Sequence, residues 1–420
     1  MLDLLIACFL GIICGTITGL VPGIHVNTAG AIIFTSTAFL LNFTSSEFLC
    51  VLLVSMSITH AMIEFIPSIF LGVPDEGTAL TILPGHKMVL EGRGKEAIRI
   101  VTIGGYGAII VTIILLPLFA LILPPLQDIL KPYTWIILVS ASIYLIYRLS
   151  NGKTSLFYSS VLFILSGVLG WGIFQTPISS NLSLMCLFTG LFGISTILFS
   201  LNQNSIIPHQ NRFYELYLNK DTLKGILAGG TTGAILGFLP GFGPAQGGIL
   251  AQEISGADEE NNTKNFLTTI SGLNTSDTIF SLYCIYLIGN PRSGIAVYMS
   301  HIIENFTINH LLIFTFASLI AVSISLILCL KLGDSFSNFM AGVDYKKLSI
   351  MAILLMVGIL YLFIFIYDGP VLYLTLALIS STALGLIPHY VGVSKSHLMG
   401  VLIVPAIIVY INMFIQYNKF

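Results

Sequence analysis

Apolar stretches separated by short polar connectors make up most of the chain. Uninterrupted stretches occur at Ala108–Leu126, Thr134–Ile146, Leu156–Phe174, Leu184–Leu201, Leu311–Leu330, Leu348–Ile366, Val371–Leu386 and Met399–Ile415. A helix of about 20 apolar residues crosses a hydrocarbon layer of roughly 30 Å. Helices and closed barrels satisfy the backbone in lipid, and the sequence lacks the alternating strands of a barrel. We therefore expect an all-α polytopic membrane protein.

Further apolar segments contain Pro or Gly in their interior. They are Leu2–Leu41, interrupted at Val21-Pro22-Gly23; Phe48–Leu83, at Pro67 and Pro74; Leu223–Ile254, at Pro240 and Pro244; and Phe266–Ile303, at Pro291. Proline removes a backbone donor and interrupts a helix. We expect broken helices or re-entrant hairpins at these Pro-Gly motifs, and about 10–14 membrane segments in all.

One pattern of glycine and proline occurs twice. GTITGLVPGIHVNTAG begins at Gly15, and GAILGFLPGFGPAQGG begins at Gly233. When Pro22 is aligned with Pro240, glycines at four-residue spacing also coincide, namely Gly11, Gly15 and Gly19 with Gly229, Gly233 and Gly237. Chance does not readily produce such a match, so the sequence indicates an internal repeat.

A second duplicated stretch follows each copy. THAMIEFIPSIFLGVPDEG begins at Thr59, and SDTIFSLYCIYLIGNPRSG begins at Ser276. The longest polar connector, Asn202–Lys224, precedes the second copy of the repeat. We therefore divide the chain into a first half of residues 1–201, a linker of residues 202–222 and a second half of residues 223–420.

The distribution of basic residues gives the two halves opposite orientations. The loop GHKMVLEGRGKEAIR carries Lys87, Arg93, Lys95 and Arg99, which predicts a cytoplasmic position. The matching region of the second half, RSGIAVYMSHIIENFTINH, contains one basic residue of this kind, Arg292. We therefore expect inverted-topology repeats, a construction of secondary transporters in which the substrate site lies where the repeats meet.

Composition supports a plasma-membrane location and excludes some functions. Of the 420 residues, 55% are hydrophobic and 9% are charged, against roughly a quarter charged in soluble domains. The formal net charge of −2 gives no reason to expect a nucleic-acid partner. The six cysteines include no C-x-x-C pair, so we interpret them as small core residues. The apolar N-terminus lacks a basic region and a cleavage site, and we expect a retained first span.

The Pro-Gly interruptions are candidates for binding an anionic substrate. A helix that restarts after such a break presents free N–H groups and the positive end of its dipole. Glycine lets the backbone approach a ligand, and polar side chains lie nearby. The candidate residues are Gly23, His25, Asn27, Thr28, Gly241, Gly243 and Gln246. The glycine stripes before each break, at Gly11–Gly19 and Gly229–Gly237, have a simpler interpretation as close helix packing.

Ionisable residues inside apolar segments are costly and mark functional sites. We predict that a coupling ion, Na⁺ or H⁺, binds near His60, Glu64, Thr275, Ser276 and Asp277. Carboxylate and hydroxyl oxygens are ligands that hard ions prefer. A structural contact within the helix bundle, or a helix cap, is the alternative. No H-E-x-x-H motif is present, so we expect neither a metal centre nor another cofactor.

Asp75 and Arg292 occupy matched positions after Pro74 and Pro291. The planar guanidinium of arginine clamps carboxylates and phosphates. We predict that Arg292 binds the substrate and that Asp75 pairs with it when the site is empty. An exposed position at the membrane surface is the alternative for both residues.

These motifs resemble the large membrane subunit, TctA, of the tripartite tricarboxylate transporter family. Pro240-Gly241-Phe242-Gly243-Pro244 fits the family pattern, as do Gly85-His86-Lys87-Met88 and Gly94-Lys95-Glu96-Ala97. Asn274 lies where the family has an Asn-Asn pair, which adds it to the substrate-binding candidates. The departures are His25, Asp75, Thr275 and Arg292, which replace family residues. The resemblance implies a small membrane subunit and an extracytoplasmic binding protein as partners.

The function expected from these features is secondary transport of a small organic anion, a carboxylate in the first instance, driven by an ion gradient. No Walker motif is present, so this chain does not use ATP directly. Transport of a phosphate-bearing or lipid-linked anion such as polyprenyl phosphate is the alternative. An intramembrane hydrolase lacks a recognisable nucleophile and base, so we do not expect an enzyme; a channel or scaffold stays open, as does a homodimer.

Overall fold

The computed structural model describes residues 2–21, 26–72, 78, 82–200, 208–213, 215, 218–238, 244–256, 262–340, 345–366 and 369–417. All regular elements in these ranges are helices, which confirms the all-α prediction. The elements up to the linker are α1 (Leu2–Leu20), α2 (Val26–Thr35), α3 (Thr37–Leu40), α4 (Ser46–Ile63), α5 (Phe65–Leu71), α6 (Ile82–Leu90), α7 (Gly94–Leu130), η1 (Lys131–Tyr133), α8 (Thr134–Arg148), α9 (Lys153–Phe174), α10 (Ser180–Phe188), the π-helix η2 (Thr189–Ile194) and α11 (Ser195–Ser200).

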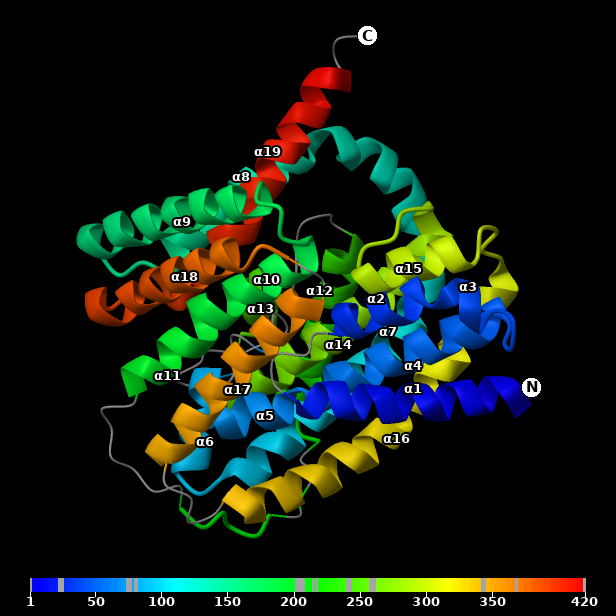
Figure 1. The fold of residues 1–420 in the computed structure, drawn as a ribbon, viewed down its shortest axis with the longest axis horizontal. Coiled ribbons are helices and arrows are strands. Elements are labelled where there is room, and N and C mark those ends of the chain that lie inside the picture. The colour runs from blue at the N-terminus through cyan, green and yellow to red at the C-terminus, as the bar shows by residue number, and fades with distance from the viewer. Residues whose placement is uncertain are drawn as a thin grey trace.

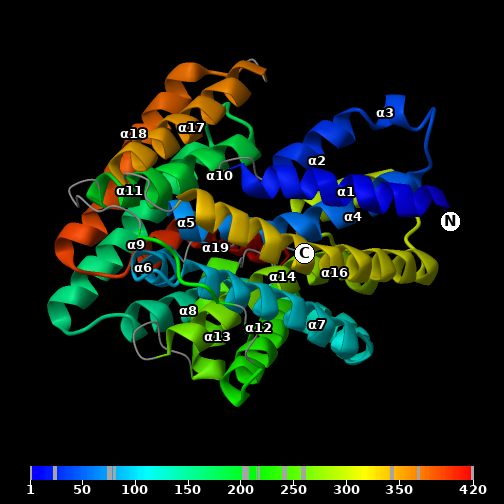
Figure 2. The ribbon, with the colours of Figure 1, turned by 90° about the horizontal axis from the view of Figure 1, so that it is seen from below.

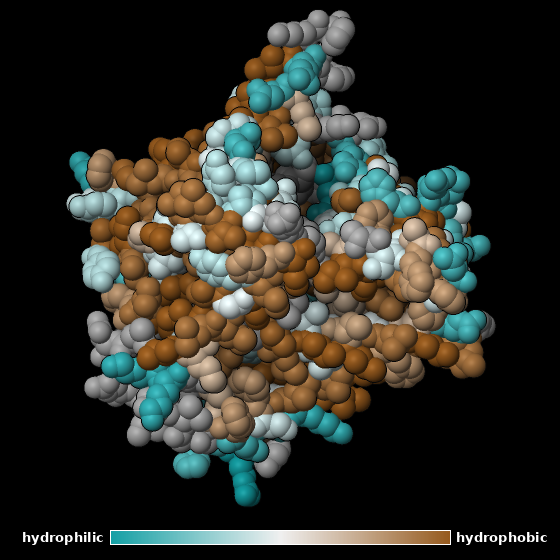
Figure 3. Space-filling model, in the orientation of Figure 1, coloured by the Kyte–Doolittle hydropathy of each residue, from teal (hydrophilic) through white to brown (hydrophobic). Residues whose placement is uncertain are grey.

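The elements after the linker are α12 (Lys220–Phe238), α13 (Pro244–Ser255), α14 (Thr263–Ile288), α15 (Gly294–Ile302), α16 (Ile308–Met340), α17 (Tyr345–Ile366), α18 (Val371–Val391), η3 (Lys395–Met399) and α19 (Gly400–Tyr417). Among the described residues, 9 helical segments are long and apolar enough to cross a membrane. Apolar side chains cover the middle of the face in Figure 3, and hydrophilic ones lie at its margins. The protein is therefore a multi-pass membrane protein, as expected.

The central helix α14 is not among the candidate membrane spans of the described residues, because its sequence is too polar. It has 26 residues, which extend about 39 Å at 1.5 Å per residue, and most of its side chains are buried. Its buried residues include Asn265, Thr268, Thr269, Ser271 and Asn274. Protein surrounds this helix on several sides, through α12, α7 and α4, so it needs no apolar surface toward lipid.

The helices form two bundles (Figures 1 and 2). The first bundle contains α1–α7 and α12–α16, and its core includes Met56, Met62, Phe280 and Tyr283. The second bundle contains α8–α11 and α17–α19, around Leu138, Leu191 and Leu374. Residues before and after the linker thus contribute helices to both bundles. Val21 and Leu71 of the first bundle pack against the core of the second, so the helix ends at two of the broken segments lie at the boundary between bundles.

The order of elements over residues 2–200 recurs over residues 220–417. The glycine stripes show the correspondence at atomic level, because α1 packs on α4 as α12 packs on α14. A Cβ at Gly15 would lie 2.4 Å from Met56 O and 2.8 Å from Thr59 Cβ. A Cβ at Gly233 would lie 2.7 Å from Leu273 O and 2.6 Å from Ser276 Cβ. These stripes therefore serve close helix packing.

The helix interruptions follow the predicted positions, with one refinement. α1 ends at Leu20 before the first Pro-Gly motif, and α12 ends at Phe238 before the second. In the segment predicted to break at Pro67, α4 ends at Ile63 and α5 begins at Phe65. Pro67 cannot donate to Ile63 O, and its ring crowds that carbonyl, so the interruption lies at Glu64, three residues before the proline.

Gly72 and Gly289 end α5 and α14 in the same left-handed conformation, with φ of 67° and 62°. An L side chain rarely adopts this conformation, and glycine adopts it freely. The two helices therefore end alike just before Pro74 and Pro291.

Candidate functional site

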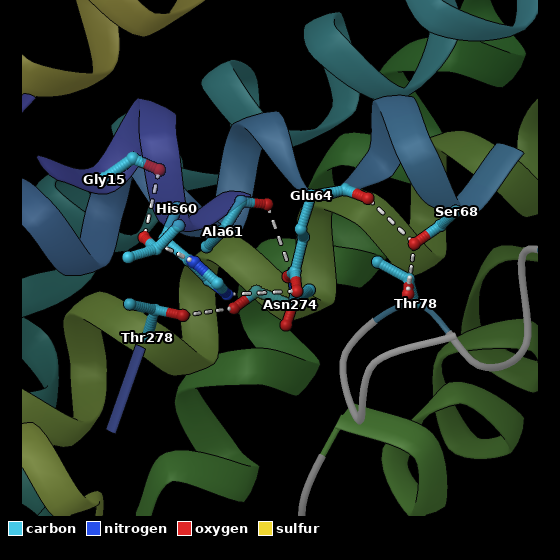
Figure 4. A network of polar contacts seen from close by, with 9 residues as sticks. Gly15, His60, Ala61, Glu64, Ser68, Thr78, Asn274 and Thr278 are labelled. Carbon is cyan, nitrogen blue, oxygen red and sulfur yellow. Dashed lines mark hydrogen bonds and ion pairs between the residues drawn. The ribbon is translucent and has the colours of Figure 1, made fainter. Parts of the chain in front are cut away.

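A cluster of polar side chains lies inside the first bundle, between α1, α4 and α14 (Figure 4). We call Thr18, His60, Glu64 and Asn274 the buried polar cluster; they are 8%, 3%, 7% and 5% exposed. His60 and Glu64 are four residues apart and share one face of α4, so His60 Nε2 lies 3.5 Å from Glu64 Oε2. The structure therefore brings together His60 and Glu64, two of the residues named as candidates for the coupling ion.

Asn274 joins α14 to α4. Its Nδ2 donates to Glu64 Oε1 over 2.6 Å and reaches the carbonyl of Ala61 at 3.4 Å. The sequence placed Asn274 with the substrate and Glu64 with the coupling ion, but the structure puts both residues in one cluster. Thr18 completes it, because its hydroxyl lies 3.0 Å from His60 Nδ1 and donates to Gly15 O at 3.2 Å.

The three residues after Asn274 point to different helices. Thr275 donates to Gly105 O of α7 at 3.0 Å, and Ser276 donates to Gly230 O of α12 at 2.7 Å. Asp277 packs beside Gly237, with its Oδ1 3.3 Å from the position a Cβ would take there. Consecutive residues of a helix diverge by about 100°, so these oxygens do not converge on one point. The assignment of these residues to a coupling ion stays a prediction.

Arg292 lies where several broken segments meet. Its guanidinium interacts with the Cys284 thiol of α14 and with the Tyr410 hydroxyl of α19. Cys284 Sγ in turn donates to Gly237 O, in the last turn of α12 before the second Pro-Gly motif. The buried Nε of Arg292 has no hydrogen-bond partner among the described residues. A guanidinium in these surroundings retains donor capacity for an anion.

Asn27 lies close to the same place. Its Oδ1 accepts a hydrogen bond from Ile295 N at 3.2 Å, at the start of α15, and Gly294 packs directly on its side chain. Ser293 caps the same helix, because its Oγ accepts from Ala296 N at 3.2 Å. The helix that follows the first Pro-Gly motif therefore contacts the residues immediately after Arg292.

Several predicted site residues lie outside this description. Gly23, His25, Asp75, Gly241 and Gly243 fall outside the described residues. Thr28 and Gln246 belong to α2 and α13, but their side chains are not among the described ones. Their roles stay predictions.

Three polar residues were not predicted from the sequence, namely Thr18, Tyr410 and Lys395. Thr18 and Tyr410 lie in apolar helices that also contain other polar residues, such as Thr16 and Asn412, and nothing in the pattern distinguishes them. Lys395 precedes the last apolar stretch, and its Nζ donates to Ser195 Oγ at 2.8 Å and to Thr196 Oγ1 at 2.6 Å. An ionisable residue next to an apolar stretch is a signal that could have identified Lys395 from the sequence.

Among the described residues, no group of three or more His, Cys, Asp or Glu side chains is arranged to hold a metal ion. The buried polar cluster contains one imidazole and one carboxylate, which suits proton binding better than metal coordination.

Comparison with known proteins places these features in a family. The model of the tripartite tricarboxylate transporter TctA family matches residues 5–400. An uncharacterized protein of Methanocaldococcus jannaschii is 31% identical over 412 residues, which cover 97% of this chain and 99% of that protein. An uncharacterized 52.8 kDa protein of Agrobacterium vitis is 24% identical over 274 residues, which cover 61% of this chain and 53% of that protein. No solved structure matches this chain.

Proposed function

The chain belongs to the tripartite tricarboxylate transporter TctA family, and we propose that it is a secondary transporter of a small organic anion. The family is one of transporters rather than enzymes, and the chain is a multi-pass membrane protein. We propose a carboxylate as substrate and an ion gradient across the plasma membrane as the energy source. A small membrane subunit and an extracytoplasmic binding protein are the partners that the family suggests.

The contacts around Arg292 are the main support for a carboxylate as substrate. The Arg292 guanidinium interacts with Cys284, whose thiol donates to Gly237 O near the end of α12. Arg292 lies two residues before α15, and Asn27 of α2 accepts a hydrogen bond from Ile295 N in the first turn of that helix. Arginine binds carboxylates through two parallel N–H bonds, and a helix N-terminus adds a favourable dipole. Tyr410 of the second bundle contributes a hydroxyl to the same place. A carboxylate bound here would contact both bundles.

The recurrence of elements supports our division of the chain into halves. We propose that residues 1–201 and 223–420 are inverted repeats joined by the linker of residues 202–222. In that construction the substrate site lies near the middle of the membrane, where the repeats meet. The contact between Asn27 and the start of α15 joins the two halves beside Arg292, which agrees with such a site.

Uptake by the purified full chain in proteoliposomes tests the proposal. Under imposed ion gradients, we expect accumulation of labelled citrate or a dicarboxylate such as succinate. Arg292→Lys keeps the charge but loses the two-pronged geometry, so the substrate concentration for half-maximal uptake should rise at least tenfold, or about 1.4 kcal/mol. Arg292→Ala should have a larger effect.

Arg212→Ala is the matched control, because Arg212 is exposed in the linker. Unchanged half-saturation in both Arg292 variants would remove this residue from the substrate site. Flipping of polyprenyl phosphate without carboxylate uptake would replace the proposed substrate by a lipid-linked phosphate.

A further inference from the structure

We infer that the buried polar cluster is a proton-binding site and that the coupling ion is a proton held between His60 and Glu64. The inference rests on the proposed ion-coupled transport and names its ion. It follows from counting the hydrogens that the contacts in Figure 4 require.

The first step fixes the proton on one ring nitrogen of His60. The hydroxyl of Thr18 has a single hydrogen, which it donates to Gly15 O over 3.2 Å. With this bond formed, Thr18 accepts at the 3.0 Å contact with His60 Nδ1, which selects one tautomer of the ring. In that tautomer of the neutral ring Nδ1 carries the hydrogen, and Nε2 directs its lone pair toward Glu64.

The second step fixes the orientation of the Asn274 amide. Its Nδ2 lies 3.4 Å from Ala61 O and 2.6 Å from Glu64 Oε1, and a backbone carbonyl accepts only. The amide thus presents its N–H₂ group, not its oxygen, to Glu64. Oε1 accepts from Asn274, which leaves Oε2 facing His60 Nε2 at 3.5 Å.

These two steps place two acceptors opposite each other when the imidazole is neutral and Glu64 is ionised. Two lone pairs at this separation repel, whereas one added proton converts the contact into an attraction. The proton resides on His60 as an imidazolium paired with a carboxylate, or on Glu64 as a carboxylic acid facing a neutral ring. The pair is therefore a site for one proton, closed to water by the burial of both side chains.

The same geometry is unfavourable for a sodium ion. Hard cations are held by several oxygens that converge at short distance. Here Glu64 faces the amide hydrogens of Asn274 and a ring nitrogen of His60, and the Thr18 oxygen is turned toward His60. Glu64 Oε1 and the Thr18 hydroxyl are already hydrogen-bonded, which leaves Glu64 Oε2 beside a ring nitrogen, and one oxygen does not supply the several converging ligands that a sodium ion needs.

Other polar and titratable groups border the buried polar cluster. From α16, the Cys329 thiol donates to Met62 O at 3.5 Å, and Ser325 donates to Thr59 Oγ1 at 2.9 Å. From α14, Asp277 lies one turn beyond Asn274, beside Gly237 of α12. From α5, Ser68 donates to the backbone carbonyl of Glu64 at 2.8 Å, so the proton pair adjoins the interruption between α4 and α5.

Proteoliposome transport with separate gradients tests the inference. In sodium-free buffer, an inward proton gradient should drive accumulation of the carboxylate, and a dye trapped inside should report proton entry with the substrate. Glu64→Gln should lose at least nine-tenths of proton-driven accumulation. It should retain exchange of labelled for unlabelled substrate, because exchange moves no net proton. Glu47→Gln, near the start of the same helix, is the matched control.

Glu64→Asp keeps a carboxyl group and should recover part of the proton-driven uptake that Glu64→Gln loses. If the two variants lose coupling equally while both insert and exchange substrate, the inference is wrong. Sodium-driven uptake by the wild-type chain without proton entry would also overturn it, and would leave the proposed transport intact. Absence of both accumulation and exchange in the wild-type chain would instead reject the proposed function.

Discussion

Asn274 and Glu64 are 210 positions apart in the chain, yet the amide of one donates to the carboxylate of the other over 2.6 Å. Asn274 lies in the middle of α14, and Glu64 lies at the interruption between α4 and α5. These are corresponding central helices of the two recurring series of elements. The hydrogen bond therefore connects the two series inside the first bundle.

The first prediction changes the charge at this contact. Asn274→Asp places two carboxyl groups against each other, and repulsion between the two negative charges favours retention of one proton between them. If release of this proton is needed for transport, release moves to higher pH, so the rising limb of the pH–uptake profile should shift upward by about 1–2 units. Initial uptake rates measured across pH check this. Asn309→Asp, at an exposed position, should keep the wild-type profile, and an unshifted profile in Asn274→Asp would separate Asn274 from proton binding.

The second prediction concerns the glycine stripes. In Gly15→Ala and Gly233→Ala the new Cβ would lie 2.4 Å from Met56 O and 2.6 Å from Ser276 Cβ. The helices must then separate, and we expect each variant to lose about 1–3 kcal/mol of stability, measured as lower thermal stability in detergent. Gly172→Ala and Gly358→Ala are the controls, because a Cβ there meets nothing within 4 Å. Equal stability of all four variants would contradict the packing role.

The third prediction concerns an ion pair that joins α7 to α16. Arg99 donates through Nη1 and Nη2 to both oxygens of Asp334, at 2.8 Å and 2.9 Å, and the Arg99 side chain is 7% exposed. Asp334→Asn removes the charge that Arg99 needs, so we expect a loss of about 3 kcal/mol in unfolding assays. The exposed pair of Arg148 and Glu253 provides the comparison. Glu253→Gln should cause no measurable loss of stability. An equal loss of stability in both variants would show that the burial of Arg99 does not strengthen its ion pair.

The fourth prediction tests the inverted repeats. Single cysteines replace Glu91, before α7, and Asn309, near the start of α16, and both positions are exposed. With the repeats inverted, a membrane-impermeant maleimide should label them from opposite sides of the membrane. Cys50, Cys186, Cys284 and Cys329 are buried, which keeps the background low. Labelling of both positions from one side would exclude inverted topology.

The sequence predicted the fold well because a membrane helix is recognised by its long run of apolar residues. The last helix was expected at Met399–Ile415, and α19 runs from Gly400 to Tyr417. The packing role of the glycine stripes was also predicted, since spacing by four residues aligns the glycines on one helix face. The extent of α7 was not predicted, because it begins at Gly94 and not at Ala108, and the charged residues Lys95, Glu96 and Arg99 in its first turns suggested a loop.

The candidate site was only partly predictable. The sequence named His60 and Glu64 together as ion-site candidates, but no pattern shows that Asn274 reaches Glu64 across 210 positions. That contact depends on how α4 and α14 pack in three dimensions. The role of Tyr410 could not be predicted for the same reason. Its hydroxyl becomes a candidate only because the fold places Arg292 of the other bundle beside it.

The composition of the second bundle has a consequence for synthesis of the protein. Its α8–α11 pack against α17–α19, and close contacts such as that of Gly170 with Val401 join parts of the chain made more than 200 residues apart. At about 5–20 residues per second, the early helices wait roughly 10–40 s in the membrane before these partners emerge from the ribosome. During that time Ser159 and Ser166, which are buried in the finished protein, face lipid or the insertion machinery. Because it includes the C-terminal helices α17–α19, the second bundle is thus the last part of the molecule to assemble.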